Sequence, residues 1–402
     1  MATKTKTIVL AYSGGLDTSV AIKWLADRYH AEIITVTADL GNNPDLPTVK
    51  KRALATGAIS AKIIDGKSVF IEDFVWPALK ASALYEGVYP LATALARPLI
   101  AKFLVEVAKQ ENAFAVAHGC TGKGNDQVRF DVSTLALAPE LQILAPARIW
   151  NMNRDQEIDY ARENNIPITI GPQTPYSVDE NIWGRSIEAG SLENPDVAPS
   201  EEVFAWTRSI DKAPSKGTEL KIDFVKGIPI GINNKKMDGL TLIEELNEVA
   251  GLHGIGRIDH IENRLVGIKS REIYEAPAAT VLHIAHNALE YLTLTKEQRD
   301  LKSAISQEYS RVVYNGLWFS THRQNLDAYI NSTQEYVSGS VRLKLHKGNC
   351  IIQGRTSPYS LYKFDLASYG QEDTFDHIAA EGFIKIYGMP VKTQAEILRD
   401  AN

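Results

Sequence analysis

The stretch Thr7-Ile-Val-Leu-Ala-Tyr-Ser-Gly-Gly-Leu-Asp-Thr-Ser19 decides the fold of this chain. An apolar run as long as a buried strand leads into two glycines and then into polar residues that favour the first turn of a helix. The paired glycines allow positive φ and a close backbone approach to a ligand, and Ser13, Thr18 and Ser19 add hydroxyls beside the unpaired N–H groups of that turn. The stretch therefore predicts a strand, a tight turn and a helix N-terminus that hold an anion, best a phosphate.

Two better-known phosphate motifs do not match this turn. A Walker A loop needs four residues between its glycines and a Lys-Ser/Thr pair at its end, and a dinucleotide fingerprint needs a third glycine. Neither requirement is met between Ser13 and Ser19. The string Ser-Gly-Gly-Leu-Asp-Thr-Ser instead resembles the pyrophosphate loop of N-type ATP pyrophosphatases, which cleave ATP between its α- and β-phosphates. The alternative is an ordinary strand-turn-helix corner that binds no ligand. We disfavour it, because a string of seven matching residues is far more specific than a glycine pair.

The composition favours small-molecule chemistry. The 402 residues suffice for two or three domains, and 44% hydrophobic with 23% charged residues is ordinary globular composition. With 43 basic and 49 acidic residues the chain lacks the basic excess of a general nucleic-acid binder. The polar start and the absence of any apolar run of membrane-spanning length predict a cytoplasmic protein without a membrane partner. Cys120 and Cys350 form no Cys/His cluster, so we expect both to be reduced and assign no metal ligand.

Strands and helices alternate through the first 170 residues. Short apolar strands are expected at 32–38, 61–65, 113–118 and 142–145, with a helical apolar pattern around residues 99–107 and an exposed helix at 155–165. Alternating strands and helices must bury both faces of the sheet. The predicted fold class is therefore α/β, a doubly wound parallel sheet whose ligands bind beyond the carboxyl ends of its strands.

A second glycine-rich loop, Gly119 to Arg129, directly follows the strand expected at 113–118. Three glycines allow close backbone approach, and Thr121, Asn125, Asp126 and Arg129 supply both donors and acceptors. A loop that merely turns needs only one or two glycines. The loop therefore suits a zwitterionic amino acid.

The second half is predicted to be α+β. Ser177 and Ser186 are expected in a loop, where serines are more often solvated than ligands. From residue 219 the apolar period becomes two, which predicts an antiparallel sheet, and a hairpin is expected at 340–353. Helices are expected at 240–250 and, almost without interruption, at 277–311, and a polar strand near 254–264. His260 and Glu262 would share one side of that strand, but without a third ligand a metal site is disfavoured.

Taken together, these strings resemble the argininosuccinate synthetase family, the ATP-dependent ligases that join citrulline to aspartate. The resemblance is carried by specific strings from Ala11 to the region of Pro277 and continues more diffusely to the C-terminus. The ATP positions that it implies are Ala11, Tyr12, Ser13, Gly14, Gly15, Leu16, Asp17, Thr18, Ser19, Ala38 and Gly119. The aspartate positions are Thr121, Asn125 and Asp126, and the citrulline positions are Tyr89, Asn125, Arg129, Ser177, Ser186, Glu262 and Tyr274. Ala94 stands where some members carry a serine that contacts citrulline, and Thr93 offers a hydroxyl that could substitute.

The resemblance also implies a mechanism and an assembly. The ureido oxygen of citrulline attacks the α-phosphorus of ATP, pyrophosphate leaves, and the aspartate amine then displaces AMP, so no residue serves as a covalent nucleophile. Mg²⁺ accompanies ATP. The implied domains are 1–170 for ATP, 171–365 for citrulline and aspartate, and a C-terminal arm at 366–402 that joins a homotetramer.

Two other classes stay open at this point. A tRNA-thiolating ATP pyrophosphatase would favour a basic surface and reactive cysteine pairs, which this sequence lacks. A non-catalytic adenine-nucleotide sensor would not need the string from Thr121 to Arg129.

Overall fold

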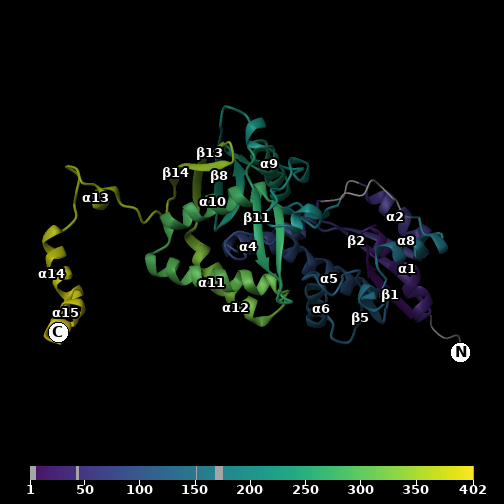
Figure 1. Cartoon of the computed structure of the whole chain (residues 1–402). Helices are drawn as coiled ribbons and strands as arrows, with labels where there is room; N and C mark the ends of the chain where they lie inside the picture. The colour runs from purple at the N-terminus through teal and green to yellow at the C-terminus, as the bar shows by residue number, and fades with distance from the viewer. Residues whose placement is uncertain (1–5, 42–44, 151, 168–174, 402) are drawn as a thin grey trace. The chain divides into compact units, whose positions relative to one another are not determined.

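The computed structural model describes residues 6–41, 45–150, 152–167 and 175–401 (Figure 1). Its contacts divide the chain into two compact units, Met1–Tyr359 and Ser360–Asn402, and each is described by itself. Among the described residues, no helix is both long and apolar enough to cross a membrane.

A five-stranded parallel sheet organises the first half and confirms the predicted doubly wound fold. Its strand order is β3-β2-β1-β4-β5. The strands are β1 (Lys6–Ala11), β2 (Ala31–Asp39), β3 (Ser60–Asp65), β4 (Ala115–Ala117) and β5 (Gln142–Leu144). The helices are α1 (Leu16–Tyr29), α2 (Leu46–Ala55), α3 (Lys67–Phe70), α4 (Trp76–Lys80), α5 (Ala92–Gln110), α6 (Asp126–Leu137), α7 (Pro146–Ile149) and α8 (Arg154–Glu163), with one π-helical turn, η1 (Ile71–Val75), between α3 and α4.

The central strand β1 is buried on both faces. Ile8 and Leu10 pack with Ile22 and Leu25 of α1 in one hydrophobic cluster, whereas Val9 belongs to a second cluster that includes much of α5. Because successive side chains of a strand point to opposite faces, helices must cover both sides of the sheet. This burial explains why β1 is apolar from Ile8 to Ala11, and it places the turn that follows at the carboxyl edge of the sheet.

Two antiparallel sheets lie in the second half of the first unit, and the period-two pattern from residue 219 predicted one of them, the sheet that contains β8 and β9. One has the order β10-β9-β8-β13-β14 and the other β11-β12-β7-β6. The strands are β6 (Ser177–Asn181), β7 (Gly184–Glu188), β8 (Thr218–Val225), β9 (Ile228–Ile232), β10 (Lys235–Lys236), β11 (Arg257–Asn263), β12 (Lys269–Glu275), β13 (Gly339–His346) and β14 (Asn349–Thr356). The helices are α9 (Gly239–Leu252), α10 (Pro277–Thr293), α11 (Lys296–Tyr314) and α12 (Thr321–Thr333).

Two local predictions were wrong. Ser177 and Ser186 lie in the paired strands β6 and β7 and not in a loop. Polar residues dominate β6 and have low strand propensity, but pairing of β7 with β12 overrides it. The long helix expected at 277–311 is two helices, because Thr295 caps α11 in a reciprocal capping box with Gln298.

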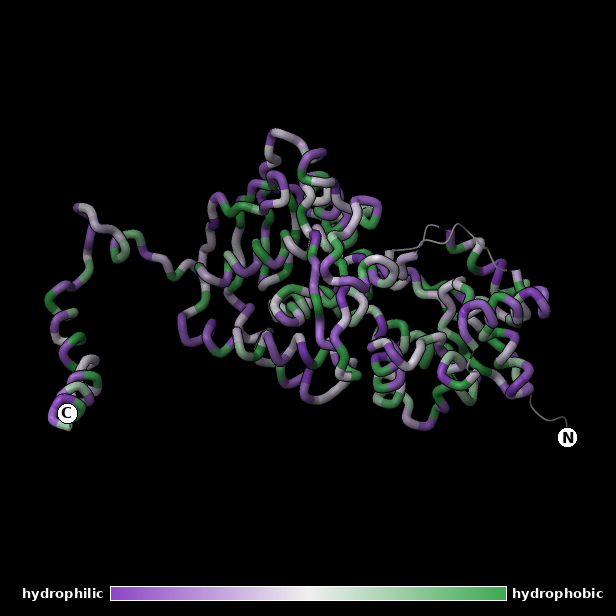
Figure 2. Tube along the Cα trace, in the orientation of Figure 1, coloured by the Kyte–Doolittle hydropathy of each residue, from purple (hydrophilic) through white to green (hydrophobic). Residues whose placement is uncertain are grey.

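The second unit carries α13 (Phe364–Ala367), α14 (His377–Tyr387) and α15 (Met389–Asp400). None of these helices has a buried residue, even though they carry several apolar side chains. Ile378, Ile386 and Val391, for example, are 87%, 68% and 70% exposed. Figure 2 shows hydrophobic residues interspersed along this segment. Apolar helices of this length gain most of their stability from packing.

Candidate active site

A cavity of about 440 Å³ brings together residues from both halves of the first unit. Every residue predicted for aspartate or citrulline lines it: Tyr89, Thr121, Asn125, Asp126, Arg129, Ser177, Ser186, Glu262 and Tyr274. Three residues predicted for ATP, Ser13, Asp17 and Gly119, also line it. The other predicted ATP residues, Ala11, Tyr12, Gly14, Gly15, Leu16, Thr18, Ser19 and Ala38, are not part of the cavity lining.

The turn after β1 holds its shape through its own hydroxyls. Gly14 has φ +81, and its carbonyl accepts a hydrogen bond from the Arg52 guanidinium. Gly15 is the N-cap of α1 and provides no side chain, so the first N–H groups of the helix lack a side-chain cap. The Ser13 hydroxyl lies 3.2 Å from the Thr18 hydroxyl. This helix start suits a phosphate group, because its cap is a glycine, the Arg52 guanidinium lies behind the turn, and two hydroxyls lie beside it.

The second glycine loop lies against the first. A Cβ atom added to Gly119 would stand 3.0 Å from Cγ2 of Thr18, so only glycine allows this contact without a shift. Gln127 folds the loop back through a 2.6 Å hydrogen bond from Nε2 to the Gly122 carbonyl oxygen. The two predicted ligand loops are therefore neighbours at the carboxyl edge of the sheet, as parallel topology requires.

Four charged side chains form a network on one side of the cavity. Asp126 accepts hydrogen bonds from Arg97 Nε at 2.8 Å and from Arg129 Nη1 at 2.9 Å, and Arg97 also pairs with Asp179. Burial raises the pKa of Asp126, but the two guanidinium groups outweigh burial, so the net shift of its pKa is downward. The carboxylate of Asp126 is therefore charged and oriented before any ligand enters.

Arg129 keeps one donor free. Its side chain is only 4% exposed, its Nε donates to the Tyr314 carbonyl oxygen at 3.1 Å, and its Nη1 donates to Asp126. Its Nη2 is buried and has no hydrogen-bond partner among the described residues. A buried guanidinium nitrogen without a partner is costly unless a ligand satisfies it. This nitrogen is therefore placed to donate to an anionic ligand in the cavity.

Tyrosine hydroxyls hold Glu262 from two sides. Tyr274 donates to Glu262 Oε2 at 2.6 Å, and Tyr314 donates to Oε1 at 2.5 Å. The ring of Tyr89 stacks on that of Tyr274 with centroids 4.1 Å apart. The Tyr89 hydroxyl accepts from the Thr93 backbone N–H at 3.0 Å, and burial raises the pKa of Tyr89 to about 12. Tyr89 therefore remains protonated and can donate its proton to a ligand.

The first turn of α5 shows which side chain could replace the serine that some family members carry at the position of Ala94. Ala94 is fully buried and does not line the cavity, whereas Thr93 does. Any hydroxyl contact from this turn of α5 would come from Thr93.

One face of the sheet β11-β12-β7-β6 forms a wall of the cavity. Ser186 pairs with Asp179 on one side and with Tyr274 on the other, so these three side chains share a face. Glu272 lies two residues before Tyr274 and also lines the cavity. Burial, with the negative charges of Glu188 and Glu262, raises the pKa of Glu272 to about 8. Glu272 is therefore mostly protonated near neutral pH, and the negative charge of this wall comes from Glu188 and Glu262, which favours an ammonium group on the ligand.

Sequence reasoning missed several residues of the site. These are Arg97, Asp179, Glu188, Arg264 and Glu272, which line the cavity, and Tyr314, which lies behind it. Reading 177–188 as two strands would have placed Asp179 beside Ser177 and Glu188 beside Ser186 on one face. Tyr314 ends a helix with regular apolar spacing, so its sequence pattern indicates only a core residue.

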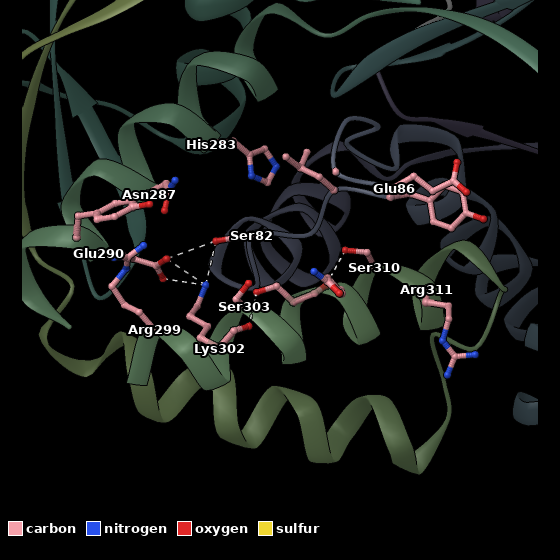
Figure 3. A pocket seen from close by; sticks show the side chains of 16 residues that line it. Ser82, Glu86, His283, Asn287, Glu290, Arg299, Lys302, Ser303, Ser310 and Arg311 are labelled. Atoms are coloured by element: carbon pink, nitrogen blue, oxygen red, sulfur yellow. Dashed lines mark hydrogen bonds and ion pairs between the residues drawn. The ribbon is translucent and has the colours of Figure 1, made fainter. Parts of the chain in front are cut away.

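A second, larger cavity of about 790 Å³ contains none of the predicted site residues. It is lined by parts of α10 and α11 and by the segment from Ser82 to Gly87. Figure 3 shows Ser82, Glu290 and Lys302 directed toward one another, and Lys302 Nζ lies 2.9 Å from Glu290 Oε1 and 2.9 Å from Ser82 Oγ. Its central charges are thus already paired. Tyr85, which also lines this cavity, stacks on Tyr314 with centroids 3.5 Å apart.

Comparison with known proteins matches nearly the whole chain. Residues 7–167 match the family model described as "Arginosuccinate synthase N-terminal HUP domain", and residues 176–394 match "Arginosuccinate synthase C-terminal domain". A protein named argininosuccinate synthase from Dehalococcoides mccartyi is 55% identical over 390 residues, 97% of this chain and 96% of that protein. Proteins of the same name from Chlorobium chlorochromatii and Brevibacillus brevis are 56% and 55% identical, covering 97% of this chain and 98% and 93% of their own lengths.

Proposed function

The chain belongs to the argininosuccinate synthase family, and from this premise we propose how its residues carry out an ATP-dependent ligation of L-citrulline to L-aspartate. The products are argininosuccinate, AMP and pyrophosphate. In the first step the ureido oxygen of citrulline attacks the α-phosphorus of ATP and pyrophosphate leaves. In the second step the aspartate amine attacks the ureido carbon of the citrullyl-adenylate, and the C–O bond to AMP breaks.

We assign ATP to the turn after β1. The residues are Ala11, Tyr12, Ser13, Gly14, Gly15, Leu16, Asp17, Thr18, Ser19, Ala38 and Gly119. The uncapped helix start and the Arg52 guanidinium behind Gly14 support this assignment, because a departing pyrophosphate gains from both. No lysine lies between Ser13 and Ser19, so the loop lacks the group that a Walker motif brings to the terminal phosphates.

We assign citrulline to Tyr89, Asn125, Arg129, Ser177, Ser186, Glu262 and Tyr274. The free Nη2 of Arg129 and the Tyr89 hydroxyl suit its carboxylate, and Glu262 suits its ammonium group. The ureido group is neutral and planar, so serine hydroxyls and the Asn125 amide suit that end.

We assign aspartate to Thr121, Asn125 and Asp126, on the loop between β4 and α6. Arg97 lies beside them and its guanidinium reaches Asp126, so this corner offers both charges to a dicarboxylic amino acid. No covalent enzyme intermediate is needed, and positioning with charge stabilisation carries the rate.

We propose that Mg²⁺ enters with ATP. Among the described residues, no group of three or more His, Cys, Asp or Glu side chains is placed to hold a metal ion. Mg²⁺ commonly binds through one or two carboxylates together with substrate phosphates, which agrees with a metal brought by the nucleotide. Asp17 is the carboxylate of the phosphate turn and lines the cavity.

We also propose a homotetramer that works in the cytoplasm. Its parts are an ATP domain at 1–170, a synthetase domain at 171–365 and an oligomerisation arm at 366–402. The exposed apolar helices α14 and α15 support the arm, because they need a partner surface. Cys120 and Cys350 are both free, as suits a reducing compartment.

The buried, unpartnered Nη2 of Arg129 beside Tyr89 and Glu262 is the observation that carries the proposal. The test measures pyrophosphate and AMP with ATP, citrulline and aspartate present, and with each amino acid omitted in turn. We expect sustained product formation only with all three substrates and Mg²⁺. Equal AMP formation without citrulline, or formation of ADP, would contradict the assignment.

A further inference from the structure

One hydroxyl group behind the cavity joins residues proposed for both amino acids. Tyr314 Oη accepts a hydrogen bond from Asn125 Nδ2 at 2.7 Å and donates one to Glu262 Oε1 at 2.5 Å. Tyr314 is 1% exposed and does not line the cavity. It therefore acts on the ligand site only through its neighbours.

We propose that Tyr314 is the positioning residue that sets the orientation of the Asn125 amide and the Glu262 carboxylate, and thereby the affinity for citrulline. The inference rests on the proposed function. The Asn125 amide is held at both ends, because its Oδ1 accepts from the Leu265 backbone N–H at 3.0 Å. With these two partners the amide nitrogen and oxygen cannot exchange places without losing both hydrogen bonds.

The direction of the hydrogen bonds follows from the chemistry of the hydroxyl. Burial and the nearby negative charge of Glu262 raise the pKa of Tyr314 far above that of free tyrosine, so the hydroxyl keeps its proton. Its one proton goes to Glu262, and its oxygen accepts from Asn125. Tyr274 supplies the second donor to Glu262, so the carboxylate plane is fixed by two tyrosines from different elements, β12 and α11.

The ring of Tyr314 has a separate structural role. It stacks on Tyr85 with an interplanar angle of 4°, and the Arg129 guanidinium lies 4.9 Å from its centroid. Phenylalanine preserves these ring contacts and removes only the hydroxyl. The substitution Tyr314→Phe therefore separates positioning from packing.

The test compares Tyr314→Phe with Tyr309→Phe in the full-length enzyme. Tyr309 lies on the same helix, is fully buried, and donates its hydroxyl to Asp327 at 2.9 Å, away from the cavity. Steady-state kinetics with each substrate varied should show the citrulline KM raised about tenfold in Tyr314→Phe, the loss expected for a hydrogen bond to a charged group. The ATP KM should stay within about twofold, and Tyr309→Phe should keep both KM values.

A double variant tests whether Tyr314 affects citrulline binding through Glu262. If Tyr314 acts through Glu262, the effects of Tyr314→Phe and Glu262→Gln on citrulline KM will be less than additive. A citrulline KM raised less than fivefold in Tyr314→Phe, an equal rise in Tyr309→Phe, or full additivity would overturn the proposal. Absence of argininosuccinate formation by the parent enzyme would instead overturn the proposed function, so the two failures are distinguishable.

Discussion

Arg129 Nη1 donates a 2.9 Å hydrogen bond to Asp126 Oδ1 within the first turn of α6, which ties a residue proposed for citrulline to one proposed for aspartate. Asp126→Asn should therefore raise the KM for both amino acids about 10- to 100-fold, as for loss of a charge-assisted hydrogen bond. Asp131→Asn is the matched control, because Asp131 lies on the same helix and pairs with Arg148 outside the cavity. A rise confined to aspartate would show that the two charges act independently.

Gly14 should tolerate no side chain. At φ +81, alanine costs about 1–2 kcal/mol in backbone strain, and its Cβ would stand 3.1 Å from Val49 Cγ2. Gly57 has φ +109 with open space around it, so Gly57→Ala imposes similar strain without the contact. The midpoint temperature of thermal unfolding should fall in both variants, whereas only Gly14→Ala should raise the KM for ATP. Unchanged ATP kinetics in Gly14→Ala would remove the assignment of this turn to phosphate.

Isotope transfer should identify the bond that breaks. If the ureido oxygen attacks the α-phosphorus, that oxygen leaves later on AMP. Citrulline carrying ¹⁸O in its ureido group should then yield labelled AMP and unlabelled pyrophosphate, as mass spectrometry would show. Label found in pyrophosphate would mean that the attack is on the β-phosphorus.

Glu272 should make stability depend on pH. Burial and the charges of Glu188 and Glu262 raise its pKa from 4.5 to about 8, so between these values the folded chain binds a proton that the unfolded chain releases. Its contribution to the free energy of unfolding is therefore full below about pH 4.5 and falls as the pH rises toward 8. In Glu272→Gln the decline in urea midpoint between pH 5 and pH 8 should be smaller than in the parent. Parallel curves for the two proteins would contradict this source of pH dependence.

Removal of the arm should change the assembly. Deletion of residues 383–402 takes away α15 and the exposed side chains Phe383, Ile386 and Tyr387. If these side chains pack against other subunits, light scattering should report a mass below that of four chains. Substitution of the exposed Lys385 by Ala is the control, and it should leave the mass unchanged. A truncated protein that stays tetrameric would exclude the arm as the assembly element.

Much of the first half could be predicted because its chemistry is local. The strand β1 is apolar from Ile8 to Ala11 and leads directly into a glycine pair at the start of a helix. The strand from Ser177 to Asn181 could not be predicted in the same way, because its polar residues face a cavity and its hairpin joins the sheet through partners on β12, about 90 residues later. Tyr314 was hidden for a related reason, since its hydrogen-bond partners lie far away in the sequence.

The hydrogen bond between Asn125 and Tyr314 spans 189 residues of sequence. All five strands of the parallel sheet have been synthesised once Leu144 is made, whereas Tyr314, which we propose to orient the amino-acid site, follows much later. At a synthesis rate of about 5–20 residues per second, the stretch from Leu144 to Tyr314 takes roughly 9–34 s on the ribosome. The residues that we propose for ATP are therefore all synthesised well before the residue that we propose to orient the citrulline site.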